Sequence, residues 1–246
     1  MNVRLIEHMG NDSSIVQAAR VSYGEGTKTK LEDRQLIRYL MRHWHTTPFE
    51  MVEFKFHIRV PIFVARQWLR HRTASVNEVS ARYSIVKDEF WMPDSYRTQS
   101  VINKQCSEGS FDDSAAFTSQ KQSCENAFDV YEGLVERGIA RELARVHLPQ
   151  STFTEFYWKI NLHNLFHFLR LRMDDHAQKE IRQVACDVFN LIKPIVPLAC
   201  QAFIDYRINS VTITGPEGQA LRTGCTDHLS RGEKVEFEEK RKLLNI

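Results

Sequence analysis

A short stretch of the chain, RHRTASVNEVSARY, gathers four basic side chains around one carboxylate. The basic groups are Arg70, His71, Arg72 and Arg82, and the carboxylate is Glu78. Guanidinium groups bind phosphate and carboxylate through planar, two-point hydrogen bonds that lysine cannot form. The preference for arginine therefore indicates a shaped anion site, although a salt-bridged helix end would give the same pattern.

Neutral polar side chains lie just before and between these charges. Gln67, Ser75, Asn77 and Ser80 supply donors and acceptors of the kind that recognise a base or a sugar. The combination predicts a site for a phosphorylated ligand such as a nucleotide. Because no GxGxxG follows a predicted strand, side chains must hold much of that ligand.

The order Arg70-His71-Arg72, seven further residues and then Ser80 resembles the R-H-R-x₇-S signature of flavin-dependent thymidylate synthases. Other blocks resemble the family's in the same order: HWHTTPFE and PIFVARQW before the signature, NEVSARYS within it, and ARELARVHLP and LRMDDHAQ after it. The resemblance covers most of residues 1–207. The region 98–126 and the tail after Asn209 contain none of these motifs.

The resemblance implies the reductive methylation of deoxyuridine monophosphate (dUMP) to thymidine monophosphate in de novo thymidylate biosynthesis. The family takes the carbon from methylenetetrahydrofolate, uses FAD as redox cofactor and NADPH as reductant, and needs no cysteine nucleophile. Its members are homotetramers with active sites where subunits meet. The implied fold is α/β (α+β mixed), with a central mixed sheet flanked by helices.

The resemblance also implies roles for individual residues. The positions that match flavin contacts are Thr47, Arg70, His71, Arg72, Glu78, Asn161, Leu162, His163 and His167. The positions that match nucleotide contacts are Gln67, Trp68, Leu69, Arg70, Glu78, Val79, Ser80, Ala81, Arg82, Arg145 and Arg172. His45 matches a histidine on the folate and nicotinamide side of the flavin.

Arg172 matches the residue that activates the uracil ring. A cation beside the ring imide would favour the ionised, nucleophilic pyrimidine. Such electrostatic activation would replace attack by a thiolate.

The pattern of apolar residues predicts the elements that position these side chains. Polar and apolar residues alternate over 52–60 and 151–161, which predicts two half-buried strands, and 3–9 could be a short opening strand. The helices predicted from apolar periodicity and capping residues span 11–23, 31–44, 61–72, 127–138, 139–148, 162–173, 175–193 and 198–208. The arginine-rich stretch is thus expected to begin at a helix end and continue as a loop.

This order of elements predicts one domain over residues 1–208. Residues 24–30 are expected to form a polar loop, and residues 98–126 a polar surface excursion. The charged segment 209–246 is expected to be an extension that docks weakly or on a neighbouring subunit.

The composition limits the possible functions. A net charge of +2 argues against a general nucleic-acid binder, although a non-catalytic module that binds a nucleotide or RNA through the arginine cluster stays an alternative. The sequence has no long apolar run of the kind found in signal peptides or membrane spans. Five cysteines without a CxxC pair predict free thiols and a cytoplasmic location.

Histidines give a second alternative. His163 and His167 lie four residues apart on a predicted helix, and His43, His45 or His176 could complete a metal site. A histidine-bound metal hydrolase is therefore possible, but the helix lacks the glutamate of an HExxH motif, and no metal is expected.

Overall fold

The computed structural model describes residues 1–21, 30–101 and 107–245. The chain divides into two compact units, Met1–Phe203 and Ile204–Ile246. The predicted loop at 24–30 lies almost entirely outside the described residues, as does Cys106.

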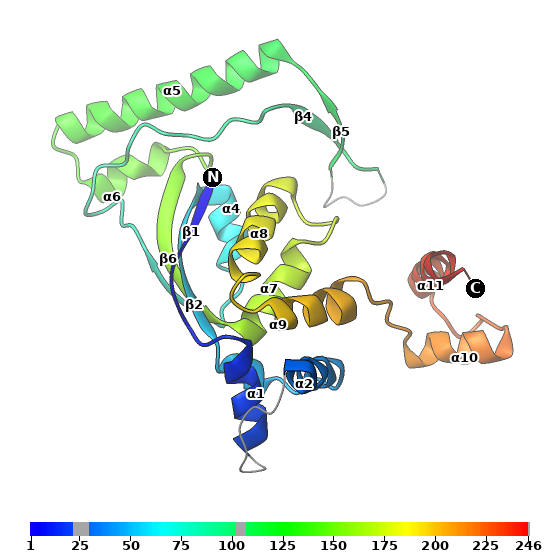
Figure 1. The fold of residues 1–246 in the computed structure, drawn as a ribbon. Coiled ribbons are helices and arrows are strands. Elements are labelled where there is room, and N and C mark those ends of the chain that lie inside the picture. Colours follow the sequence, from blue (N-terminus) through cyan, green and yellow to red (C-terminus); the bar gives the residue numbers. More distant parts are fainter. Residues whose placement is uncertain (22–29, 102–106, 246) are drawn as a thin grey trace. The chain divides into compact units, whose positions relative to one another are not determined.

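The first unit is built on a four-stranded sheet with the order β1-β2-β6-β3 (Figure 1). Its strands are β1 (Asn2–Met9), β2 (Glu53–Pro61), β3 (Ser75–Glu78) and β6 (Phe153–Asn161). The predicted opening strand and both predicted main strands are confirmed. Each pairing in this sheet is antiparallel, so the mixed class of helix and sheet is confirmed, whereas the expected mixture of strand directions is wrong.

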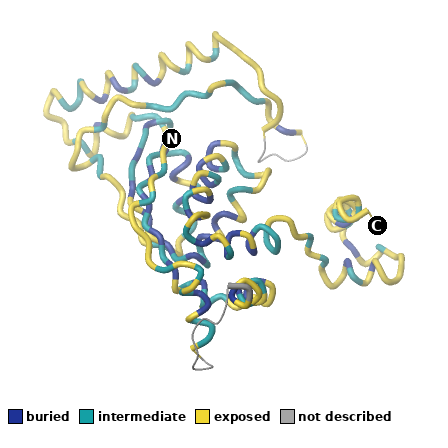
Figure 2. The backbone as a smooth tube through the Cα atoms, in the orientation of Figure 1, coloured by how far each residue is buried: buried dark blue, intermediate teal, exposed yellow. Residues whose placement is uncertain are grey.

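One face of the two central strands carries the core, and the buried residues are dark blue in Figure 2. The buried side chains of that face are Phe54, Phe56, Ile58, Val60, Phe156, Trp158 and Ile160. Phe56 lies opposite Trp158 in the register, and their ring centroids are 5.9 Å apart. Alternation in sequence therefore became alternation across the sheet, because successive side chains of a strand point to opposite faces.

Strand β3 corrects the prediction that the arginine-rich stretch continues as a loop. Its residues pair with β6 from Ser75 opposite Lys159 to Glu78 opposite Phe156. All four of its residues are exposed. A short polar strand at a sheet edge buries no apolar face, so it leaves no period-two signal in the sequence.

Three helices cover the apolar face of the sheet, as Figure 1 shows. They are α4 (Ile62–Trp68), α7 (Leu162–Arg172) and α8 (Lys179–Ile192). Helix α4 directly follows β2, and α7 directly follows β6. Trp68 of α4 packs against both β6 and α7, because its ring centroid lies 5.1 Å from that of Trp158 and 4.5 Å from that of Phe168.

A second group of helices in the first unit packs together. They are α1 (Asp12–Arg20), α2 (Lys30–Arg42), α3 (Thr47–Glu50) and α9 (Pro197–Phe203). Asn11 caps α1, and Asp12 accepts hydrogen bonds from the backbone N–H groups of Leu198 and Ala199 at 2.8 and 3.0 Å. One turn near the N-terminus thus also caps a helix almost two hundred residues later.

The region 98–126, which the sequence predicts to be a polar surface excursion, has regular secondary structure over most of its described residues. It contains most of the hairpin of β4 (Tyr96–Gln99) and β5 (Ser107–Phe111), and it leads into α5 (Ser114–Glu136). The buried residues of α5 are Cys124, Phe128 and Tyr131. Their spacing of four and three residues is a narrow helical stripe, which the many serines and glutamines around it obscure.

The chain then forms α6 (Arg141–Ala144) and a 3-10 turn over Arg145–His147 before it enters β6. Both short elements lie in the region where residues 139–148 are predicted to be helical.

The second unit, where the sequence predicts an extension after residue 208, contains two helices. After the π-helical turn Ile204–Ile208 come α10 (Gly215–Thr223) and α11 (Arg231–Leu244), and each of these two helices begins with a capping box. Ala220, Leu229 and Phe237 form a small apolar cluster, and Lys240 Nζ contacts both carboxylate oxygens of Glu217 at 2.7 and 3.0 Å. Among the described residues of both units, none of the helices combines the length and the apolar character needed to cross a membrane.

Candidate active site

A cavity of ≈370 Å³ lies where the chain leaves β3. We call it the β3 cavity. The sequence-predicted residues that line it are Glu78, Val79, Ser80, Ala81 and Arg145. They reach it from three elements, because β3 supplies Glu78, the following turn supplies the next three residues, and the 3-10 turn before β6 supplies the arginine.

Backbone hydrogen bonds shape the wall of the β3 cavity. The N–H of Val79 donates to the carbonyl of Glu155 at 2.9 Å, which continues the pairing with β6. The carbonyl of Ser80 accepts from the N–H groups of Tyr83 and Ser84, both at 3.1 Å. These bonds close the chain into a tight turn, so the segment after β3 is held against the sheet edge.

The sequence reasoning missed two threonines that line the β3 cavity. Thr154 donates from its hydroxyl to the carboxylate of Glu78 at 2.5 Å, and Thr152 has a buried hydroxyl without a hydrogen-bond partner. Thr154 lies two residues before Phe156, on the core face of β6. A polar residue at a position where alternation predicts an apolar one is the signal that could have revealed it.

Arg82 lies beyond this cavity. Its guanidinium contacts the carboxylate of Glu142 at 3.3 Å, and both side chains are about half exposed. An exposed ion pair of this kind contributes little to stability, so the guanidinium remains available to another ligand.

A second group of predicted residues meets between α4 and α7. Nε of Arg172 donates to Nε2 of His71 at 3.0 Å, and an Nη of the same guanidinium donates to the backbone carbonyl of Gln67 at 3.2 Å. A guanidinium can only donate, so Nε2 of His71 must be the unprotonated nitrogen and Nδ1 must carry the hydrogen.

Electrostatics support that protonation state. Burial, with the nearby charge of Arg172 and the ring of His167, lowers the pKa of His71 to about 4. The ring centroids of the two histidines are 6.0 Å apart. Burial also lowers the pKa of Arg172. At neutral pH the group therefore consists of a cation and a neutral imidazole.

The lowered pKa of His71 predicts a specific sensitivity to acid. Between about pH 6.5 and 4 the unfolded chain binds a proton at this residue and the folded chain does not, so stability falls as pH falls through that window. We expect the urea midpoint of the flavin-free protein to drop more between pH 7.5 and 5 than that of His71→Gln, which cannot titrate. His147→Gln, at an exposed histidine, should behave like the unaltered chain. Parallel loss in all three proteins would contradict the expectation.

A third group lies in a groove of ≈1020 Å³ among α1, α2 and α3, and includes His45 and Thr47. We call it the α1–α3 groove. Helix α2 ends in a turn in which Trp44 takes a left-handed backbone (φ 60°) and the N–H of His45 donates to the carbonyl of Leu40 at 3.0 Å. The ring of His45 stacks on that of Tyr39, with centroids 5.8 Å apart.

The remaining predicted residues divide by exposure. Arg70, Arg72 and His167 are exposed, and His163 is half-buried. Trp68 and Leu162 are fully buried in the core, so only backbone atoms of these two could reach a ligand. Asn161 caps α7 by accepting from the N–H of Asn164 at 3.0 Å, and Leu69 is the residue that ends α4.

Within one chain the α1–α3 groove and the β3 cavity are separate. The residues that line the groove come from positions 14–51, and those that line the cavity come from positions 59–155. All the residues that line the groove precede β2 in the chain, whereas Arg59, which lines the cavity, lies near the end of that strand. Six residues of extended strand span roughly 20 Å, so a single copy keeps these two sites apart.

No metal centre forms in the described part of the chain. Over residues 1–21, 30–101 and 107–245, no three His, Cys, Asp or Glu side chains come together as ligands. The pair His163 and His167 therefore has no described third ligand, and nothing here favours the metal-hydrolase alternative.

The matches to known proteins span the part of the chain that contains all three groups of residues. The sequence model of a family described as "Thymidylate synthase complementing protein" matches residues 4–198. A flavin-dependent thymidylate synthase of Dictyostelium discoideum is 56% identical over 238 residues, which are 95% of this chain and 78% of that protein. Another, from Thermus thermophilus, is 56% identical over 220 residues, 89% of this chain and 82% of that protein.

The fold is similar to solved structures as well. One is a UMP/dUMP methylase, PolB from Streptomyces cacaoi, bound with 5-Br dUMP. It gives a TM-score of 0.78 at 36% identity, and the match covers 84% of this chain and 95% of that one. The same methylase bound with 5-Br UMP gives a TM-score of 0.76 at 34% identity.

Proposed function

This chain belongs to the family of flavin-dependent thymidylate synthases, and on that premise we propose how its own residues carry out the reaction. The enzyme methylates dUMP to thymidine monophosphate and depends on FAD. NADPH and methylenetetrahydrofolate are its co-substrates, as in the family. The observation that carries the proposal is the convergence of Glu78, Ser80 and Arg145 on the β3 cavity.

The nucleotide is proposed to bind at the β3 cavity and beside Gln67 and Arg172. A nucleotide phosphate carries close to two negative charges and is best bound by guanidinium groups. Arg145 lines the cavity and Arg82 lies at the exposed turn that follows it. The hydroxyl of Ser80 and the carboxylate of Glu78 offer an acceptor pattern suited to sugar hydroxyls.

The flavin is proposed to lie against the end of α4 and the start of α7. The residues present fit such a group, because Arg70 and Arg72 are exposed cations just past α4 and FAD carries two phosphates. His71, His163, His167 and Thr47 would add further hydrogen-bonding groups. When bound, FAD supplies the redox chemistry, and the protein supplies orientation and charge.

Arg172 is proposed to activate the uracil. Its guanidinium is held by the acceptors on His71 and Gln67, which leaves further N–H groups to donate. A fixed cation beside the ring would stabilise the ionised imide and make the five-position carbon of the ring more nucleophilic. Neutral His71 would hold the guanidinium in place without competing with its charge.

The active sites are proposed to form between copies of this chain in a homotetramer. Apolar side chains that are more than half exposed gather on the turn after β3 and on the α6 region. They are Val79 (54%), Tyr83 (77%), Ile85 (58%), Leu143 (62%) and Val146 (75%). Exposed apolar residues around a cavity with charged lining residues are typical of an interface, and a second subunit would cover them and complete the site.

We place the reaction in the cytoplasm, as the scattered cysteines predict. The four described cysteines are free thiols, and Cys124 and Cys200 are buried. Cell fractionation of the native source would test this location.

The function is tested by the absorption spectrum of the purified protein and by its products. We expect a yellow protein whose bound flavin bleaches when NADPH is added without oxygen, and which forms thymidine monophosphate from dUMP. UMP should be offered in parallel, because the similar methylase is solved with analogues of both nucleotides. A colourless protein that stays inactive after FAD is added would sink the proposal.

A further inference from the structure

We propose that Glu180, a residue outside the sites described above, acts as a positioning residue that fixes the orientation of the Gln67 side-chain amide, and hence which of its atoms faces the nucleotide. The inference rests on the proposed function and deepens it. Gln67 and Glu180 are more than one hundred residues apart, and Gln178 connects them.

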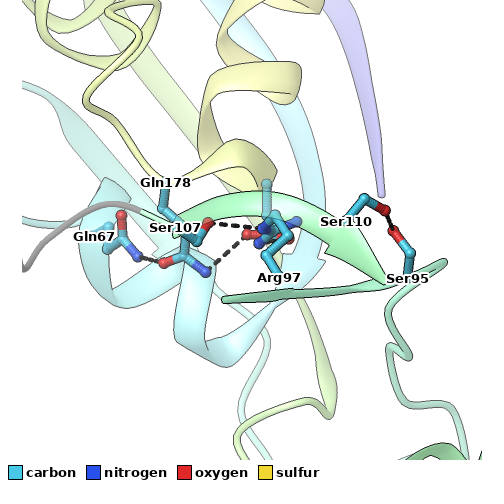
Figure 3. Close-up of polar contacts among 7 residues, drawn as sticks. Gln67, Ser95, Arg97, Ser107, Ser110 and Gln178 are labelled. Atoms are coloured by element: carbon cyan, nitrogen blue, oxygen red, sulfur yellow. Dashed lines mark hydrogen bonds and ion pairs between the residues drawn. The ribbon is translucent and has the colours of Figure 1, made fainter. Parts of the chain in front are cut away.

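A continuous line of hydrogen bonds joins the two residues, and Figure 3 shows Gln67, Gln178 and Arg97 along it. The side-chain N–H of Gln67 donates to the side-chain carbonyl of Gln178. The side-chain N–H of Gln178 donates in turn to the carboxylate of Glu180 at 2.8 Å. The line therefore runs from the end of α4 to the first turn of α8. We call these three residues, Gln67, Gln178 and Glu180, the relay.

Glu180 is anchored at its other oxygen. Arg97 of β4 donates to that oxygen at 2.7 Å, and its Nε donates to the hydroxyl of Ser107 on β5 at 2.8 Å. Glu180 is only 4% exposed, and a buried carboxylate is tolerated where it is paired and hydrogen-bonded. Burial alone would raise the pKa of Glu180, but the hydrogen bonds from Arg97 and Gln178 hold it below its usual value.

The ionised carboxylate gives the line a direction. A carboxylate can only accept, so Gln178 must turn its NH₂ group towards Glu180 and its carbonyl oxygen towards Gln67. Gln67 must then turn its NH₂ group towards Gln178. The opposite orientation of either amide would place two acceptors, or two donors, against each other.

The consequence reaches the nucleotide site. With its NH₂ group directed at Gln178, Gln67 has its side-chain carbonyl oxygen left for the ligand. Its backbone carbonyl already accepts from Arg172, so Gln67 lies next to the proposed uracil-activating cation. Gln67 therefore presents its side-chain carbonyl oxygen as an acceptor for a donor group of the nucleotide.

Gln178→Ala removes the middle of the relay and leaves the buried Glu180 carboxylate paired with Arg97. Wild-type enzyme, Gln178→Ala, Glu180→Gln and the control Ser110→Ala are titrated with dUMP by calorimetry and assayed for turnover. Ser110 bonds to Ser95 at 2.8 Å in the same hairpin but lies off the relay (Figure 3). We expect Gln178→Ala and Glu180→Gln to weaken dUMP affinity and raise KM by roughly three- to tenfold, with kcat and bound flavin nearly unchanged. Ser110→Ala should match the wild type.

The outcomes separate the relay from the function on which it rests. Two results for Gln178→Ala would overturn the relay. One is a dUMP affinity within twofold of the wild type. The other is an equal fall in dUMP affinity, kcat and bound flavin, because such a fall would mark a merely structural role. Because Glu180→Gln leaves Arg97 without its anion, it can fail to fold, and Gln178→Ala then decides alone. A wild-type chain that binds no dUMP would overturn the proposed function, and the relay with it.

Discussion

Replacing Arg172 by alanine is expected to lower the turnover number for thymidylate formation by about 10²- to 10³-fold, the usual loss when a preorganised electrostatic group is removed. The guanidinium is the cation held between His71 and the Gln67 carbonyl, at 3.0 and 3.2 Å. Flavin content should stay near that of the wild type, because the exposed arginines past α4 remain. The measurement compares kcat with the ratio of bound flavin to protein.

Two further variants sharpen that comparison. Arg170→Ala removes an exposed guanidinium from the same helix, two residues earlier, and should keep wild-type turnover. Arg172→Lys keeps the charge but loses the planar set of donors, so its turnover should fall between the wild type and the alanine variant. If Arg172→Ala lost flavin and turnover in equal proportion, the residue would be structural or a cofactor contact, not the group that activates uracil.

Mixing two inactive variants, Ser80→Ala and His45→Ala, is expected to restore activity. The two residues line separate cavities of one chain, so a site that needs both would draw them from different subunits. In randomly assembled tetramers about one site in four would receive both intact residues, so up to roughly a quarter of wild-type activity should return. The measurement is thymidylate formation after co-expression of the two variants.

A matched pair of variants provides the control for mixing. Glu78→Ala and Ser80→Ala alter the same short segment, so every mixed site would still carry one defect and no activity should return. Native mass spectrometry of differently tagged chains would show whether mixed tetramers have formed. Mixed tetramers without activity in the Ser80 and His45 pair would mean that each site lies within one chain.

The sequence pattern alone identified the core strands of this protein. Phe54, Phe56 and Phe156 alternate with polar residues, and a strand must place such residues on opposite faces. The long-range partner of each strand could not be read in this way. Strand β3 carries polar residues at a sheet edge, and α5 hides a narrow apolar stripe among serines, so both depend on contacts that local periodicity does not record.

The candidate site divides in the same way. The types and spacing of Arg70, His71, Arg72 and Ser80 were enough to predict an anion site and the family, because guanidinium chemistry and a fixed motif are local properties. Only the tertiary structure brought Arg172 to His71, buried the latter so that its pKa falls to about 4, and kept the α1–α3 groove apart from the β3 cavity.

The relay to Gln67 belongs wholly to the folded chain. Arg97 and Glu180 lie outside every quoted motif, and Gln178 ends the LRMDDHAQ block without an assigned role. The Glu180 carboxylate is buried at the first turn of α8, so it needs hydrogen-bond donors there. Accepting from Gln178 fixes the orientation of the Gln178 amide and, through it, that of the Gln67 amide. Residue types thus determined what this protein binds, while burial and distance decided which atoms face the ligand.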